Sequence, residues 1–190
     1  MRKNLFESFL LFFMILFSGL VSASGFDVRP SESYDFPVDG SFPPAIKVGE
    51  TIECGDYAFQ IMYPPVLAKS FQGMIASKDL KYLTMRVGIT NNSEETIGWI
   101  APDSFRVQEI IRNQIFGTYK LDYLMSAKAA AGYSWKAFYS AIAPGETLQT
   151  LIVFSVFQEA NDWIFYLSPH IFGESSKETI QFRLPAVTVQ

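Results

Sequence analysis

Hydrophobic and polar residues alternate along most of the chain after residue 46. The clearest run covers residues 83–89, where every odd-numbered position is apolar, and residues 57–61 show the same period. A period of two is typical of a strand with one buried face. Residues 163–167 and 180–184 repeat it, whereas residues 147–157 are almost continuously apolar. That last pattern predicts a central strand covered on both faces.

Turn-forming residues separate these runs. They are Asn91-Asn92-Ser93, Arg112-Asn113, Pro144-Gly145 and Ser168-Pro169. Short alternating runs between such turns favour an all-β antiparallel sandwich or barrel. We expect Asn91 and Asn92 to adopt left-handed turn geometry, which asparagine tolerates well.

One segment departs from the strand pattern. Residues 121–131 are rich in Leu, Met, Lys and Ala and precede Gly132. These are good helix formers, and glycine often follows the end of a helix. We therefore expect a short helical or irregular insertion near residues 121–132.

The first 23 residues form a separate unit. A basic start is followed by a 13-residue apolar run at 9–21, interrupted by Ser18 and Gly19. This run is shorter than the about 20 residues that span a bilayer, and small residues follow it. The pattern predicts a signal peptide cleaved after Ala23; the alternative is an uncleaved N-terminal membrane anchor.

Two further units follow the signal segment. Residues 24–45 hold four of the chain's ten prolines, which predicts an extended linker. We expect its aromatic residues, Phe42 among them, to dock on the protein's own surface. Residues 46–190 would form the β-sandwich domain.

The net charge of the chain argues against some classes of binding partner. The whole chain has 15 Lys and Arg against 19 Asp and Glu, and without residues 1–23 the counts are 13 and 18. A mildly acidic protein argues against nucleic acids and anionic membrane surfaces as main partners.

The chain has few residues suited to metal or covalent chemistry. Cys54 and His170 are the single cysteine and the single histidine. A zinc or copper site needs several such ligands, so we expect no metal and no cofactor. A catalytic Cys54–His170 pair would require the two to meet in space, and a buried structural cysteine is the favoured interpretation.

Carboxylates offer a second kind of chemistry. The candidates are Glu94 with Glu95, Asp103 with Glu109, and Asp56. A hydrolase would need two of them to face each other across a cleft. Glu94 and Glu95 lie in a predicted turn, where acidic residues are usually solvated.

Aromatic residues gather around the predicted insertion. Six lie between positions 119 and 139, and several of them are needed for a sandwich core. If Tyr123, Tyr133 and Trp135 are instead exposed, they form a candidate ligand surface, because exposed rings make good stacking and hot-spot contacts.

The run at 81–97, KYLTMRVGITNNSEETI, resembles the core strand and turn of a family of exported bacterial domains. Further matches lie at 102–107, 143–148 with 152–156, and 162–169, so the resemblance covers residues 48–186. The family is mostly of unassigned function and is related in fold to mycobacterial immunoprotective extracellular antigens. The resemblance implies an exported immunoglobulin-like β-sandwich of about 7–9 strands and no functional residues. Unlike the family, this chain lacks Asp-Gly near Asn113 and carries an insertion at 120–140.

Three functions remain open from the sequence. The favoured one is a non-enzymatic exported module that binds a protein or cell-envelope ligand through loops and the Tyr-rich insertion. A protease inhibitor would use an exposed loop such as residues 127–133. A carboxylate-dependent hydrolase would need two buried, converging acidic groups.

Overall fold

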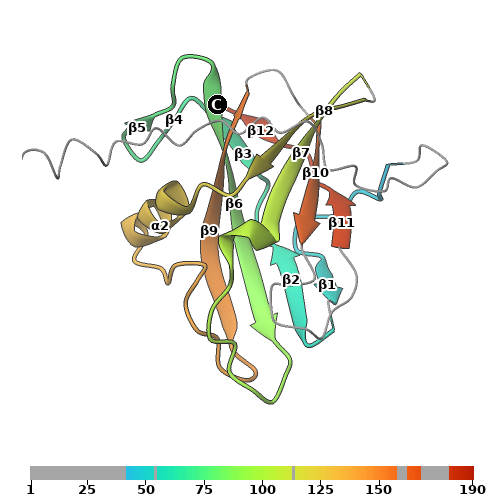
Figure 1. Cartoon of the computed structure of the whole chain (residues 1–190), viewed down its shortest axis with the longest axis vertical. Coiled ribbons are helices and arrows are strands. Elements are labelled where there is room, and N and C mark those ends of the chain that lie inside the picture. Colours follow the sequence, from blue (N-terminus) through green and yellow to red (C-terminus); the bar gives the residue numbers. More distant parts are fainter. Residues whose placement is uncertain (1–41, 54, 113, 158–161, 168–179) are drawn as a thin grey trace, which may run out of the picture. The chain divides into compact units, whose positions relative to one another are not determined.

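The computed structural model describes residues 42–190 except 54, 113, 158–161 and 168–179 (Figure 1). The predicted signal peptide, most of the predicted linker, Cys54 and His170 therefore lie outside the described residues. Within them, a six-stranded and a four-stranded sheet form an all-β sandwich, as the alternating pattern predicted, and a two-stranded hairpin and one short α-helix accompany them. No helix in this part of the chain is long and apolar enough to span a membrane.

The larger sheet is built around the long strand β6. Its strands are β1 (Thr51–Glu53), β2 (Tyr57–Ile61), β6 (Leu80–Asn91), β3 (Val66–Ala68), β12 (Thr188–Val189) and β9 (Thr147–Phe157). One edge of β6 pairs first with β3 and then with β2, and the other edge pairs with β9 along its length. All of these pairs are antiparallel; β12 runs parallel to β3.

The smaller sheet has four antiparallel strands. Their order is β11 (Ile180–Arg183), β10 (Asp162–Leu167), β7 (Phe105–Ile111) and β8 (Gln114–Lys120), with the 3₁₀ turn η1 (Pro102–Ser104) leading into β7. Together the two sheets have six and four strands, more than the about 7–9 expected, because short strands extend the edges.

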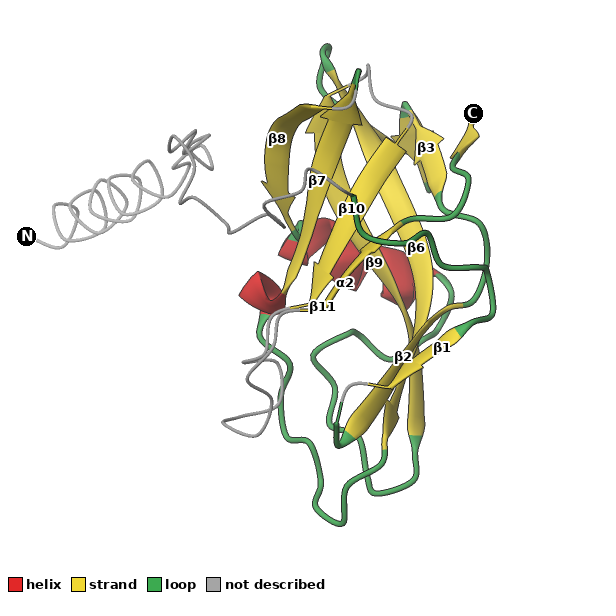
Figure 2. Cartoon of the chain, turned by 90° about the vertical axis from the view of Figure 1, so that its right-hand side faces the viewer, coloured by secondary structure: helices red, strands yellow, loops and turns green. Residues whose placement is uncertain are grey.

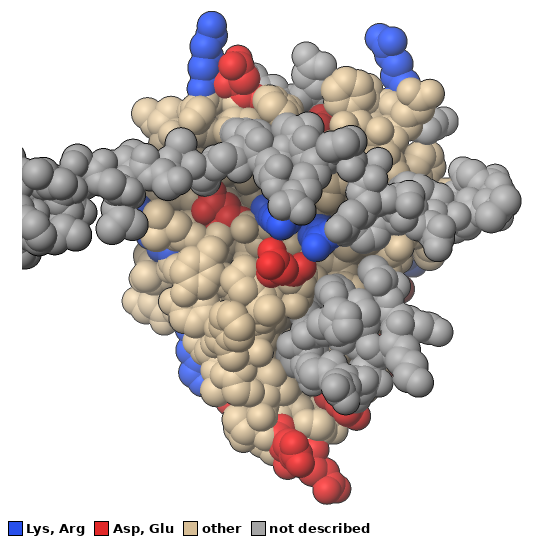
Figure 3. Space-filling model, viewed as in Figure 1, with Lys and Arg blue, Asp and Glu red and all other residues tan. Residues whose placement is uncertain are grey.

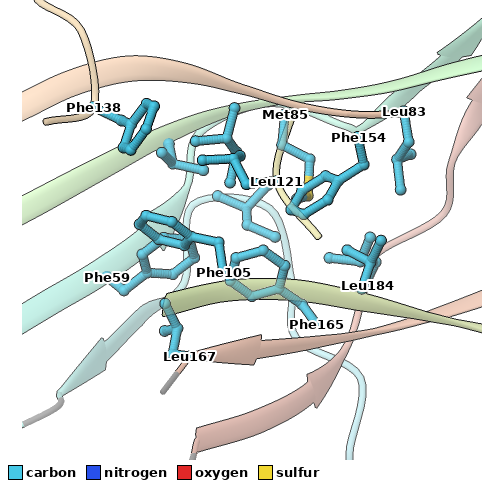
Figure 4. Packing of buried hydrophobic residues seen from close by; sticks show 14 of the residues in the cluster. Phe59, Leu83, Met85, Phe105, Leu121, Phe138, Phe154, Phe165, Leu167 and Leu184 are labelled. Atoms are coloured by element: carbon cyan, nitrogen blue, oxygen red, sulfur yellow. The ribbon is translucent and has the colours of Figure 1, made fainter. Parts of the chain in front are cut away.

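The core lies between the two sheets (Figure 4). The odd-numbered apolar residues of β6 and those of β10 are buried there, as their period predicted. Phe165 on β10 stacks on Phe59 at a centroid distance of 5.3 Å and meets Phe154 edge-on at 6.2 Å. Such ring pairs add to the free energy gained from burial alone.

A second apolar cluster lies on the outer face of the six-stranded sheet. Helix α2 (Tyr123–Gly132) and the hairpin of β4 (Ser70–Phe71) and β5 (Met74–Ile75) cover it. Asp122 caps the helix by accepting a 3.0 Å hydrogen bond from the backbone N–H of Met125. The predicted insertion is thus a helix.

Strand β9 is buried on both faces, but it is not central in the sheet. Among the described strands it pairs only with β6, and α2 lies beside it, on the side away from β10 and β11 (Figures 1 and 2). Asp122 donates its backbone N–H to the carbonyl of Val153, and Val153 donates its own N–H to the hydroxyl of Ser126. The helix therefore supplies the cover and the hydrogen bonds that a second neighbouring strand would give.

The turn after β6 uses a side chain rather than the expected left-handed backbone. Neither Asn91 nor Asn92 has a positive φ. Instead the buried amide of Asn91 accepts from the Ser93 N–H and donates to the carbonyls of Glu95 and Ile142. These bonds hold the turn together.

The outer face of the four-stranded sheet carries a third small cluster. Ile110, Ile164 and Tyr166 form it, and Phe42 packs against it. The Phe42 ring also lies 5.8 Å from the Arg183 guanidinium carbon. The prediction that this linker aromatic docks on the protein's own surface is confirmed.

Candidate ligand-binding surface

Tyr133 and Trp135 come together where α2 ends. Tyr133 is the C-terminal capping residue, and Ser134 turns the chain with a φ of 58°. The backbone N–H of Trp135 then bonds back to the carbonyl of Ala130. This turn stacks the two rings with centroids 5.2 Å apart and an angle of 29° between their planes.

Arg86 extends this pair across the outer face of the sheet. It stands on β6, and its guanidinium carbon lies 3.8 Å from the centroid of Trp135 and 4.7 Å from that of Tyr63. Tyr63 follows the end of β2. Tyr133, Trp135, Arg86 and Tyr63 thus form what we call the aromatic–arginine stack.

The ends of the stack are open to solvent. Tyr133 is 52% exposed and Tyr63 is 54% exposed, whereas Trp135 and Arg86 are intermediate. The Arg86 guanidinium carbon lies over the ring of Trp135, and the Trp135 ring stacks on that of Tyr133. Stacked rings of this kind lose little conformational freedom when a ligand binds.

Arg86 has no acidic partner among the described residues. No carboxylate there lies within salt-bridge distance, and its buried Nε has no hydrogen-bond partner. Lys136, the residue after Trp135, does have an acidic partner, because it pairs with Glu146 at 2.6 Å. That hydrogen bond lowers the pKa of Glu146, with a smaller contribution from the backbone N–H of Ala143.

Tyr123 does not join this stack. It opens α2, so the helix of ten residues places it about 15 Å from Tyr133. It is 44% exposed, stacks on Tyr139 at 5.2 Å and meets Phe138 edge-on. A hydrogen bond with Tyr139 raises the pKa of Tyr123. The structure therefore divides the three predicted surface residues between two places.

Arg86 and Tyr63 were not predicted from the sequence. Arg86 is the one charged residue within the alternating run of 83–89, and that is the only local signal. Tyr63 carries no signal, because only the pairing of β2 with β6 brings it near Arg86.

Among the described residues, the candidate carboxylates do not form the facing pair that a hydrolase would need. Glu94 and Glu95 are exposed in the turn after β6, and Asp56 is exposed as well. Asp103 is exposed, 3.8 Å from Lys120. Glu109 is buried within β7, whereas Asp103 lies at the surface in the 3₁₀ turn that precedes this strand.

Two other kinds of site that the sequence raised, a metal site and an inhibitory loop, differ from expectation or are absent in the described part of the chain. No group of three or more His, Cys, Asp or Glu side chains is placed there to hold a metal ion. The segment 127–133, expected to be an exposed loop if the protein were a protease inhibitor, is helical up to Gly132. A helix does not present the extended backbone that the loop hypothesis requires. On the face shown in Figure 3, the described Lys and Arg side chains are scattered and form no continuous basic patch.

Comparison with known proteins gives only distant similarities to solved structures. No family model and no curated protein matches the chain. Similar solved structures include a "putative lipoprotein" from Staphylococcus aureus, with 15% identity, a TM-score of 0.48 and coverage of 76% of this chain and 97% of the other. An uncharacterized β-sandwich protein from Clostridium difficile has 11% identity, a TM-score of 0.43 and coverage of 82% and 98%. The chain also covers 38% of the "putative lipoprotein" ycdA from Bacillus subtilis, at 13% identity and a TM-score of 0.48, with 72% of this chain aligned.

Proposed function

We propose that this chain is an exported, non-enzymatic module with an immunoglobulin-like β-sandwich, which binds a protein or cell-envelope ligand through the aromatic–arginine stack. Export is supported by the signal-peptide pattern of residues 1–23. Attachment to the membrane by an uncleaved N-terminus is the alternative. The descriptions of two structural neighbours as lipoproteins are compatible with either.

The observation that carries the proposal is the exposure of the outer rings. A stack that only covered the sheet would gain most from burying its members, because burial of apolar area is the source of its stability. Tyr133 and Tyr63 instead keep about half of their surface in water. Exposed aromatic groups on a rigid support are typical of binding surfaces.

The support under the stack is rigid. Arg86 belongs to the central strand of its sheet, where it pairs with Leu151 of β9. Trp135 is tied to the end of α2 by its backbone hydrogen bond to Ala130, and it also packs against the apolar cluster under the helix. Sites built on strands and helices hold their geometry better than sites on loops.

Co-sedimentation with insoluble bacterial sacculi, with their wall polymers attached, tests the proposal. The protein is purified from the exported fraction of its host. We expect it to pellet with the sacculi, and we expect Tyr133→Ala to weaken binding by about ten-fold or more, since a hot-spot ring contributes at least this much.

Phe116→Ala is the matched control. Phe116 is 76% exposed, but it lies on β8 of the other sheet. This variant should bind like the wild type. An equal loss of binding in both variants would contradict the proposal, and an absence of binding to sacculi would contradict a cell-envelope ligand.

A further inference from the structure

We infer that the ligand of this surface is an acidic glycan, whose sugar rings pack on the exposed rings of the stack and whose carboxylate or phosphate groups bind to Arg86. The inference rests on the proposed function and specifies its ligand class. It follows from the way Arg86 is held.

The guanidinium group of Arg86 is stacked but not neutralised. Its central carbon lies over the ring of Trp135, 3.8 Å from the centroid, and over the ring of Tyr63, 4.7 Å from the centroid. Ring faces attract a cation, but they do not accept hydrogen bonds in the plane of the guanidinium. Only its edge remains for hydrogen bonding, and no described residue accepts from it.

Three other described basic side chains do pair with carboxylates. Arg183 pairs with Asp162, Lys136 with Glu146, and Lys120 with Asp103. Arg86 is thus a stacked arginine on an acidic protein without a carboxylate partner. A positive charge left in this way matches an anionic group supplied by a ligand.

An apolar residue at position 86 would cover the sheet at lower cost. Leu151, the cross-strand partner of Arg86, does this on β9 and is buried. Placing an arginine here instead leaves its Nε buried without a hydrogen bond, which costs desolvation free energy. A ligand that accepts from the guanidinium edge would offset this cost.

The neighbouring rings indicate the rest of the ligand. Tyr133 and Tyr63 stand at opposite ends of the stack with open surface, and aromatic faces pack well against the apolar C–H faces of sugar rings. The guanidinium fork matches carboxylate and phosphate equally in geometry. A polymer that combines sugar rings with repeated acidic groups satisfies both features at once.

Binding to four soluble polymers tests this inference. We would titrate the exported protein with polygalacturonate, poly(glycerol phosphate) teichoic acid, neutral dextran and poly-L-glutamate, and follow binding by calorimetry. We expect at least one of the two acidic glycans to bind about ten-fold or more tightly than dextran and poly-L-glutamate. The first two polymers distinguish a carboxylate from a phosphate as the recognised group. Binding should also weaken as salt is added, since charge pairs at a surface are screened.

Arg86→Lys is the deciding variant, because it keeps the charge and removes the planar fork. We expect it to lower the affinity for the acidic glycan by about ten-fold or more. Lys128→Gln removes a charge from the exposed side of α2 and should change the affinity less than about two-fold. Tyr133→Ala provides a second variant that does not alter the buried part of the stack.

The outcomes separate the inference from the proposed function. Equal affinity for dextran and the acidic glycans, or an unchanged affinity in Arg86→Lys, would overturn the inference. If sacculus binding still depended on Tyr133 in that case, the proposed function would remain supported. Tighter binding of poly-L-glutamate would overturn it in favour of an acidic protein partner. Failure to bind any polymer would also overturn it.

Discussion

The hydroxyl of Tyr119 donates a 2.5 Å hydrogen bond to Oε2 of Glu109 inside the sandwich. Glu109 is 1% exposed and faces the core from β7, opposite Trp163 in the register of the sheet. Tyr119 stands on β8, and its ring lies over Gly117. This contact joins the edge strand of the smaller sheet to a buried acidic group.

Tyr119→Phe removes that donor, together with the backbone hydrogen bond between the hydroxyl and Phe157. Oε2 of Glu109 then loses its hydrogen bond from the hydroxyl in a buried environment, and the loss of such a bond costs about 1–3 kcal/mol. We expect the free energy of unfolding, measured by urea denaturation, to fall by this amount. Tyr63→Phe, at an exposed position, should change it by less than about 0.5 kcal/mol. Equal stability of the two variants would show that the Glu109 contact contributes nothing.

The stability should fall at alkaline pH. Burial, and then the hydrogen bond to Glu109, raise the pKa of Tyr119 above its ordinary value of 10, and burial raises the pKa of Tyr166 to about 12. The unfolded chain releases both protons near pH 10, while the folded protein keeps them. The two tyrosines therefore make their full contribution to the free energy of unfolding below about pH 10. This contribution is lost as the pH rises towards 12.

Urea midpoints measured between pH 8 and 11.5 would check this dependence. Tyr166→Phe removes one of the two groups, so its stability should fall less steeply above pH 10 than that of the wild type. A wild-type midpoint that stays constant over this range would contradict the prediction.

Gly117→Ala should act through Tyr119. A Cβ at residue 117 would lie 3.0 Å from Oη of Tyr119, which is closer than side chains normally approach. The phenol must then move away from Glu109, and we expect a loss of about 1 kcal/mol or more. In a Tyr119→Ala background the same substitution should cost almost nothing. Additive losses in this double-mutant cycle would refute the coupling.

Ser126→Ala should loosen the helix-covered edge of β9. The buried hydroxyl of Ser126 accepts from the Val153 N–H at 2.9 Å and donates to the carbonyl of Asp122 at 2.7 Å. Its removal leaves the Val153 N–H without its acceptor, at a cost of about 1–3 kcal/mol. Hydrogen exchange at the Val153 amide should become faster. Lys128→Ala, on the exposed side of the same helix, should leave that rate unchanged.

The alternation of side chains between the two faces of β6 and β10 could be predicted from the sequence, because it depends only on strand geometry. Successive side chains of a strand point to opposite faces, so the period of two marks the buried face without knowledge of the partner strand. A short helical or irregular insertion near residues 121–132 was predicted for a similar reason, since composition and the following glycine act locally, and the structure shows that it is a helix. The double burial of β9 was also readable, but its cause was not, because an apolar face can be covered by a strand or a helix alike.

The candidate site also combines contacts that the local sequence predicts with contacts that depend on the tertiary structure. Tyr133 and Trp135 are close in sequence and were predicted together, whereas Tyr123 was grouped with them although the helix carries it to the other end. Arg86 and Tyr63 join the stack only through the pairing of β2 with β6. By itself the sequence determined which faces of the strands are buried, because side-chain direction is a local property of the backbone. The tertiary structure alone decided which residues meet on the outer surface, because contacts between distant segments depend on strand pairing and on where the helix packs.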